Sequence, residues 1–353
     1  MLRFGPYWRL LCVFALILPS QQAPAQVPAQ VPFLADKTNA PHARVVIVED
    51  PGATQNLQPV PEKIQFLVDR AITNLTGKPS VAAAWGSLVS TQDTVGLKVL
   101  SEQGPNSGTR PAVVAAVVQG LIASGVPPQK IIIWDKHSVD LRLAGFYEFE
   151  QTYGVRVMGS IEAGYDKNTF YETALLGTLR WTDIEFGQKG TGIGRKSYVS
   201  NLLTTQITKI INITPMIHHN LAGVSGNLYS LADGSVDNTL RFEGSAGDLG
   251  RAVPEIYALP ILGDRVVLNI VDGLICQYEG QQRGLLHYST VLNQLRFSRD
   301  PVALDVLSLQ EIEHQREIAG VPNLKTNLDL YPNASLLEIG VSDLKHIDVE
   351  KLR

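Results

Sequence analysis

The sequence is poor in cysteine. Only Cys12 and Cys276 occur among its 353 residues, and Cys12 lies in a leader that we expect to be removed. A single remaining thiol cannot form an intrachain disulfide or a four-cysteine metal site. We therefore expect no iron–sulfur cluster in this chain, and we expect Cys276, at the end of an apolar strand, to be a buried thiol.

An excess of positive charge is also missing. Lys and Arg number 30 against 34 Asp and Glu, which gives a net charge of −4 at pH 7. A nucleic-acid partner is not expected, because such proteins carry a broad basic surface. Hydrophobic residues make up 44% of the chain, enough for a substantial core in a chain of this length.

Long hydrophobic runs are absent as well. The run Leu10 to Leu18 is preceded by Arg3 and Arg9 and followed by Ala23-Pro24-Ala25. It is too short to span a bilayer, which takes about 20 residues, but it is typical of a signal peptide. We predict a signal peptide over residues 1–25, a periplasmic or secreted location, and no stable membrane anchor after cleavage.

The rest of the chain predicts a tether and one domain. Residues 26–43 are rich in Ala, Gln and Pro and indicate an exposed tether. Residues 44–353 show no clean linker and no repeat, which favours a single α/β domain.

Apolar runs and helical spacing alternate along this domain. Strands are predicted at 45–48, 95–99, 131–134, 155–158, 210–213 and 266–271, and helices from Pro61, from Pro111 to a stop at Gly125, and over 303–319 with Asp300 as N-cap. This alternation predicts a mostly parallel or mixed sheet covered by helices, interrupted by an irregular Gly-rich insertion at 160–200.

Polar side chains follow three of these strands. They are Asp135-Lys136-His137, His218-His219-Asn220, and Asp272. Because ligands of parallel sheets bind beyond the carboxyl ends of the strands, these residues could form a His and carboxylate site for a divalent metal or for acid–base catalysis.

Structural readings of the same residues stay open. Asp272-Gly273 is also a turn signal. Adjacent His218 and His219 should point in opposite directions on a strand, so we expect at most one of them to face the crevice.

A second candidate site suits an anion. The loop that ends in Thr109-Arg110 leads into the helix at Pro111, where free N–H groups attract phosphate or carboxylate, and Lys98 lies in an otherwise apolar strand. Lys98, Thr109 and Arg110 are therefore candidate anion-binding residues. An ordinary helix terminus and a structural ion pair are the alternatives.

The stretch from Gly187 to Lys196 is rich in Gly and basic residues. It lacks the spacing of a phosphate-binding loop. A basic loop or lid and a solvated surface loop are the two remaining interpretations.

Several stretches together resemble the bacterial and archaeal family called domain of unknown function 362, over about residues 94–320. These are TVGLKVL (94–100), GTRPAVVAAVVQGLIASGV (108–126), IIIWDK (131–136), LAGF (143–146), HHNLAGVSGNLYSLADGSVDN (218–238), VVLNIVDGL (266–274) and SRDPVALDVL (298–307). The resemblance adds Asp237, Asn238 and Asp305 to the candidates. Some members carry a ferredoxin-type cysteine cluster, which this chain lacks.

The leading hypothesis is an exported enzyme that acts on a small anionic substrate. Lys98 and Arg110 would hold the anion, and Asp135, His218, His219 and Asp272 would bind a metal or transfer protons. The alternative is a non-catalytic ligand-binding protein or an accessory subunit of a redox complex, with a protein partner.

Overall fold

The computed structural model describes residues 41–280, 283–322 and 328–353. The predicted signal peptide and the tether up to residue 40 lie outside these residues. Residues Pro41–Arg353 form one compact unit. Within the described residues no helix is both long and apolar enough to cross a membrane.

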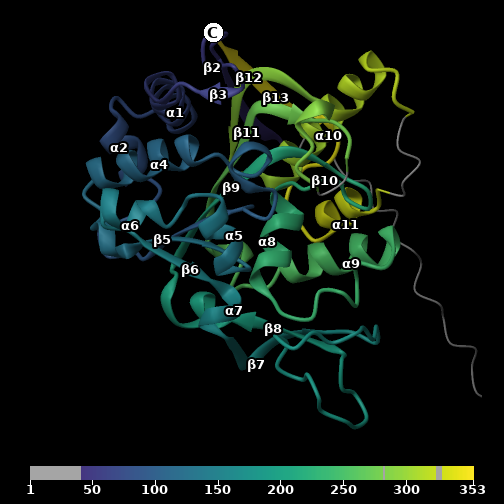
Figure 1. Cartoon of the computed structure of the whole chain (residues 1–353). Coiled ribbons are helices and arrows are strands. Elements are labelled where there is room, and N and C mark those ends of the chain that lie inside the picture. The colour runs from purple at the N-terminus through teal and green to yellow at the C-terminus, as the bar shows by residue number, and fades with distance from the viewer. Residues whose placement is uncertain (1–40, 281–282, 323–327) are drawn as a thin grey trace, which may run out of the picture. The chain divides into compact units, whose positions relative to one another are not determined.

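A mixed sheet forms the centre of this unit (Figure 1). Its strand order is β13-β1-β12-β11-β9-β4-β5-β6. The strands are β1 (Ala43–Glu49), β4 (Val95–Val99), β5 (Ile131–Asp135), β6 (Arg156–Gly159), β9 (Lys209–His219), β11 (Val266–Gln277), β12 (Ser289–Ser298) and β13 (Ile347–Leu352). In this order only β12 runs against its neighbours, so the expected α/β class with a mostly parallel sheet is confirmed.

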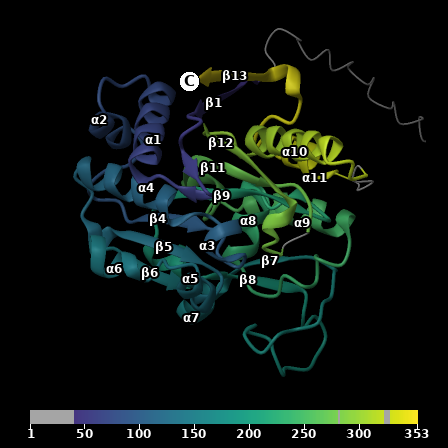
Figure 2. The ribbon, with the colours of Figure 1, turned by 45° about the horizontal axis from the view of Figure 1, so that its top comes forward.

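Helices cover both faces of the sheet (Figure 2). One face packs against α1 (Pro61–Thr76), α2 (Val81–Gly86), α4 (Pro111–Ala123) and α6 (Glu148–Tyr153), and the other against α8 (Asn227–Ser235), α9 (Ala246–Tyr257), α10 (Pro301–Ile318) and α11 (Leu330–Leu336). Both faces of the central strands are buried, which explains why these strands are continuous apolar runs.

Local sequence signals set the helix ends, and the starts of α1, α4 and α10 lie where the sequence predicts them. Pro61 and Pro111 stand at the first turns of α1 and α4, where the missing N–H costs no hydrogen bond. Gly77 ends α1 with φ 65°, a left-handed conformation that favours glycine. Asp300 caps α10 by accepting a hydrogen bond from Ala303 N at 2.8 Å, as predicted.

Short elements connect the rest of the chain. They are the hairpin β2 (Thr54–Gln55) and β3 (Gln58–Pro59), the helices α3 (Gly104–Ser107), α5 (Ser138–Leu143) and α7 (Ser160–Ala163), and β10 (Gly223–Val224), which pairs with β9.

Three sequence predictions about elements need correction. The predicted turn at Asp272-Gly273 is wrong, because β11 continues to Gln277 and absorbs these residues in a bulge against β9 and β12. The strand predicted at 210–213 extends to His219 as β9. The Gly-rich insertion is not wholly irregular: β7 (Tyr165–Glu172) and β8 (Lys196–Ser200) form an antiparallel pair at its base.

Candidate functional site

A polar cavity of about 200 Å³ lies at the carboxyl ends of β4 and β5. We call it the strand-end pocket. Its walls are Leu100, Glu102, Asp135, Lys136, His137, Asp140, Arg180, Tyr229, Asp233 and Glu243. It is where a parallel sheet is expected to bind a ligand, and the predicted Asp135-Lys136-His137 run contributes three of its walls.

Lys98 and Asp135 form a buried ion pair under this pocket. Lys98 Nζ lies 2.8 Å from Asp135 Oδ1 and also donates to Ser230 Oγ at 3.0 Å and to the Val99 carbonyl at 2.6 Å. The other carboxylate oxygen of Asp135 accepts from the backbone N–H and the hydroxyl of Ser101. All three ammonium donors of Lys98 therefore have protein partners, and its side chain is fully buried.

The rim of the pocket carries a carboxyl group with a shifted pKa. Loss of hydration, followed by the negative charges of Asp233, Asp140 and Asp135, raises the pKa of Glu102 to about 7. The Glu102 side chain is exposed at the rim, where the neighbouring carboxylates disfavour its charged form. At neutral pH this carboxyl group can both give and take a proton.

Two further carboxyl groups in the wall, Asp233 and Glu243, have pKa values shifted in opposite directions. Burial alone would raise the pKa of Asp233, but the Lys136 ammonium, at 3.1 Å, holds it below its usual value. Burial and the charge of Asp233 raise the pKa of Glu243, which hydrogen-bonds to Asp233. Lys136 is fixed by a second hydrogen bond, to Thr239 Oγ1 at 2.9 Å. The pair therefore combines an ionised carboxylate with a carboxyl group that tends to keep its proton.

The other predicted cation, Arg110, lies in a sealed cluster. Arg110 Nη1 is 3.0 Å from Asp272 Oδ1, and the Arg110 backbone N–H, at the start of α4, donates to Asp272 Oδ2 at 3.0 Å. Both side chains are buried. The start of α4 binds the carboxylate of Asp272 in the same chain, and the anionic ligand expected from the sequence stays a prediction. Thr109 ties the same loop to the sheet through its hydroxyl, which donates to the Ile213 carbonyl and accepts from Leu100 N.

The two adjacent histidines have different surroundings. His219 packs its ring on Tyr229, with centroids 4.3 Å apart, and its Nδ1 accepts from the backbone N–H groups of Leu221 and Ala222. His218 lies near Arg316 and is buried, and neither of its ring nitrogens has a hydrogen-bond partner among the described residues. His219 contacts a wall of the strand-end pocket through Tyr229, and neither histidine lines the pocket itself.

Both imidazoles are neutral at physiological pH. Burial, with the nearby Arg316 charge, lowers the pKa of His218 to about 4. Burial and the neighbouring His218 lower the pKa of His219 to about 4 as well. In the part of the chain that the structure describes, no three His, Cys, Asp or Glu side chains converge in a way that could hold a metal ion.

Asp237 and Asn238 hold the Gly-rich insertion in place. The carboxylate of Asp237 accepts from Ile184 N at 2.9 Å and from Tyr198 N at 2.6 Å. The Asn238 amide donates to the carbonyls of Gly194 and Lys196, and Asn238 has φ 39°, a value that asparagine tolerates. Neither residue lines the strand-end pocket.

The remaining two candidates lie away from the pocket walls. Asn220 is exposed in the turn after β9. Asp305 accepts from the N–H groups of Asn227 and Leu228 at the start of α8, and burial raises its pKa to about 7.

Sequence reasoning missed most of the pocket walls. The rule that located Asp135 could also have found Glu102, which follows β4 closely, and Asp140, which follows β5. It could not find Asp233, Glu243 or Arg180, because these come from α8, from the segment before α9, and from the insertion.

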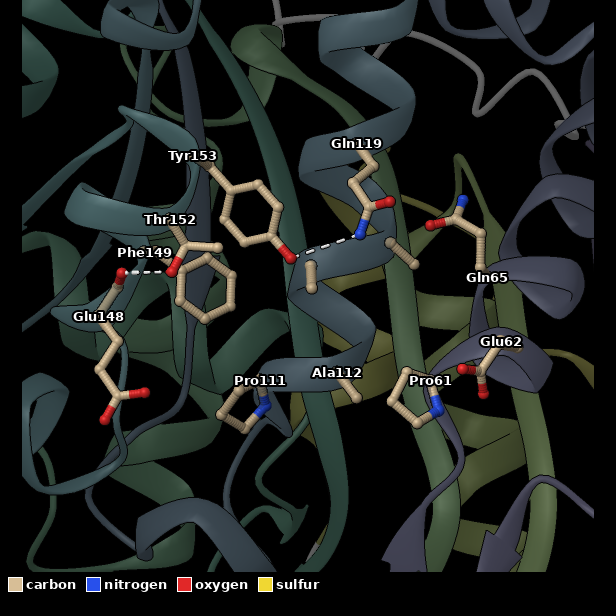
Figure 3. A pocket seen from close by; sticks show the side chains of 12 residues that line it. Pro61, Glu62, Gln65, Pro111, Ala112, Gln119, Glu148, Phe149, Thr152 and Tyr153 are labelled. Atoms are coloured by element: carbon tan, nitrogen blue, oxygen red, sulfur yellow. Dashed lines mark hydrogen bonds between the residues drawn. The ribbon is translucent and has the colours of Figure 1, made fainter.

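A larger cavity of about 540 Å³ lies among α1, α4 and α6 (Figure 3). Alanine and proline side chains form much of its wall, and Glu62 and Glu148 are the charged groups among its described lining residues. Gln119 Nε2 donates to Tyr153 OH at 3.4 Å. None of the predicted site residues lines it.

The fold and site define an α/β protein with an acidic polar pocket at the carboxyl ends of adjacent parallel strands. The chain belongs to the family described as Domain of unknown function (DUF362), whose model matches residues 95–310, which confirms the resemblance drawn from its motifs.

One solved structure to which the chain shows a distant similarity comes from Thermotoga maritima, a structural-genomics target. It is 9% identical, with a TM-score of 0.40 over 74% of this chain, and this chain spans 60% of its length. Among curated proteins none matches the chain.

Proposed function

We propose that the chain is an exported enzyme that performs general acid–base chemistry on a small polar substrate in the strand-end pocket. The observation that carries the proposal is the grouping of Glu102, Asp233 and Glu243 around one cavity with their pKa values driven apart. In many active sites, neighbouring titratable groups have surroundings that shift their pKa values in opposite directions, so that one group acts as the acid and the other as the base.

The chemistry of the walls suits a cationic or hydroxyl-rich substrate better than the anion expected from the sequence. Five carboxyl groups face two side-chain cations, Lys136 and Arg180. Asp135 and Asp233 are each paired with a lysine. The carboxyl groups that remain outnumber Arg180, so a substrate amine or hydroxyl would find acceptors there.

The proposed roles follow from the contacts. Asp233, kept ionised by Lys136, would accept a hydrogen bond from the substrate and orient it. Glu102, whose pKa is raised to about 7, would exchange protons with it near neutral pH, and Glu243, whose pKa is raised by burial and by the charge of Asp233, would donate a proton to it. The Lys98–Asp135 pair would support the floor of the pocket as a positioning element.

Ligand-dependent thermal unfolding tests this proposal. The protein is scanned with diamines, amino sugars, polyols, divalent cations, phosphate and small carboxylates. We expect the cationic or polyhydroxylated compounds to raise Tm with concentration, as binding to the native state requires. Glu243→Gln and Asp140→Asn should remove the rise, whereas Glu148→Gln, in the larger cavity, should preserve it. Stabilisation by anions alone, or equal loss in the Glu148→Gln control, would refute the proposal.

The same ligand then separates catalysis from binding. Incubation with the protein, followed by mass spectrometry, should reveal a product that the Glu243→Gln variant does not form. A ligand that stabilises the protein but is recovered unchanged would instead support the non-catalytic binding role.

A further inference from the structure

The connection between β7 and β8, residues 173–195, projects from the rest of the ribbon in both views (Figures 1 and 2). We call it the insertion loop. It exposes large apolar side chains: Trp181 is 80% exposed, Leu176 62% and Phe186 53%. Single exposed apolar residues are common, but three of this size on one loop mark an interaction surface.

The acidic and basic residues of the insertion loop differ in their exposure to solvent. Its acidic residues, Asp183 and Glu185, are both buried. Its basic residues, Arg180, Lys189 and Arg195, are all exposed. The surface that the loop shows to solvent is therefore apolar and positively charged, although the chain as a whole has a net charge of −4.

The buried side chains of Asp183 and Glu185 stabilise the loop by accepting hydrogen bonds from its backbone and from neighbouring residues. Asp183 accepts from Arg180 N at 2.6 Å and from Asn238 N at 3.0 Å. Glu185 accepts from Gly194 N at 2.6 Å and from the hydroxyl of Tyr198 at 2.9 Å. With the Asp237 bond to Ile184 N, these contacts fix the backbone on both sides of Trp181, so its exposure is a property of the fold.

We propose that the insertion loop is a docking surface for anionic phospholipid membranes. Trp181, Phe186 and Leu176 would enter the interfacial region, where Trp is favoured, and Lys189 and Arg195 would contact lipid phosphates. A membrane fits better than a protein partner, because a stable protein interface needs about 800 Å² from each side, whereas a projecting loop can insert its tip alone. This surface is independent of the proposed function, although Arg180 also lines the strand-end pocket.

Tryptophan fluorescence provides a site-specific test. Trp85 and Trp134 are fully buried, so in a full-length Trp8→Phe background Trp181 is the exposed indole of the described chain. Vesicles of phosphatidylglycerol and phosphatidylcholine in equal parts should shift its emission to the blue, and pure phosphatidylcholine vesicles should shift it far less. The shift should weaken with added salt. The emission reports entry of the loop itself, so vesicle binding by the leader does not produce it.

Variants identify the residues responsible. Lys189→Glu with Arg195→Glu should weaken binding by more than tenfold, since each cation near an anionic surface contributes about fivefold. Phe186→Ala should weaken it roughly tenfold. The matched control, Lys78→Glu with Lys345→Glu, makes the same charge change at exposed sites outside the loop and should bind like the parent.

Three results would overturn the proposal. The first is an unshifted Trp181 emission with phosphatidylglycerol vesicles. The second is equal weakening by the control pair, which would mean attraction by total charge. The third is a shift that depends on protein concentration without vesicles, which would make the loop an interface between copies of the chain.

Discussion

Two ion pairs on the carboxyl side of the same sheet use similar residues for different purposes. At β5, Asp135 pairs with Lys98 beside a polar cavity. At β11, Asp272 pairs with Arg110 and lies fully buried against the start of α4. The two aspartates therefore differ in what surrounds them: Asp135 borders a cavity, whereas the start of α4 fills the space beside Asp272.

The fully buried pair of Arg110 and Asp272 gives the largest expected effect. Asp272→Ala leaves Arg110 buried without its partner, which should lower the free energy of unfolding by about 3–5 kcal/mol. Guanidinium-induced unfolding of the variant and of the parent protein measures this difference in free energy.

Asp135→Ala should lower the free energy of unfolding by less than Asp272→Ala, because water can enter the cavity beside Asp135. Arg110→Met with Asp272→Leu should be less destabilised than Asp272→Ala, since no unpaired charge remains. A loss below about 1 kcal/mol for Asp272→Ala would contradict the sealed cluster.

The two buried histidines, His218 and His219, give the next largest expected effect. Their folded pKa values of about 4 lie below the ordinary 6.5, so between these pH values the unfolded chain binds more protons than the folded one. Stability should therefore fall as pH drops from 6.5 towards 4, by up to about 3 kcal/mol for each imidazole. The free energy of unfolding, measured at several pH values across this range, should depend less on pH in His218→Gln and in His219→Gln than in the parent protein. The exposed His314→Gln should leave the curve unchanged, and an equal change there would reject the assignment.

Glu102, at the rim of the strand-end pocket, gives the smallest expected effect. The raised pKa of Glu102 means that the folded chain holds a proton that the unfolded chain releases, so its contribution to stability falls as pH rises from about 4.5 through 7. Glu102→Gln should stabilise the protein slightly at pH 8 relative to pH 5. Because Glu102 is exposed, solvent screening limits the gain to about 0.5 kcal/mol. Differential scanning at both pH values measures it, and a large loss of stability at pH 8 would contradict the arrangement of charges around the pocket.

Elements with local signals were predictable from the sequence. The start of α4 follows from Pro111, the cap of α10 from Asp300, and the buried strands β4 and β5 from their apolar runs. In the same way Asp135 was found because it directly follows the strand predicted at 131–134, and it is the last residue of β5.

Features that depend on packing were not predictable in this way. Asp272 was expected to turn the chain or face a ligand, but the bulge of β11 and the position of α4 decide its partner. Asp233 and Glu243 reach the pocket from outside the strand ends. Asp237 stabilises a distant loop through hydrogen bonds to Ile184 and Tyr198 that no spacing indicates.

The position of β1 has a consequence for how the protein is made. This strand is the first among the described residues, yet Val46 pairs with Phe297 in β12 and Ala43 pairs with Ile347 in β13. A chain that emerges from the ribosome N-terminus first must keep β1 unpaired until β12 has appeared, and the other edge of β1 stays open until β13 has appeared. An apolar edge would stay open for that whole interval, so the chain is most exposed to aggregation and proteolysis during its synthesis, and loss of its last strand should prolong that state.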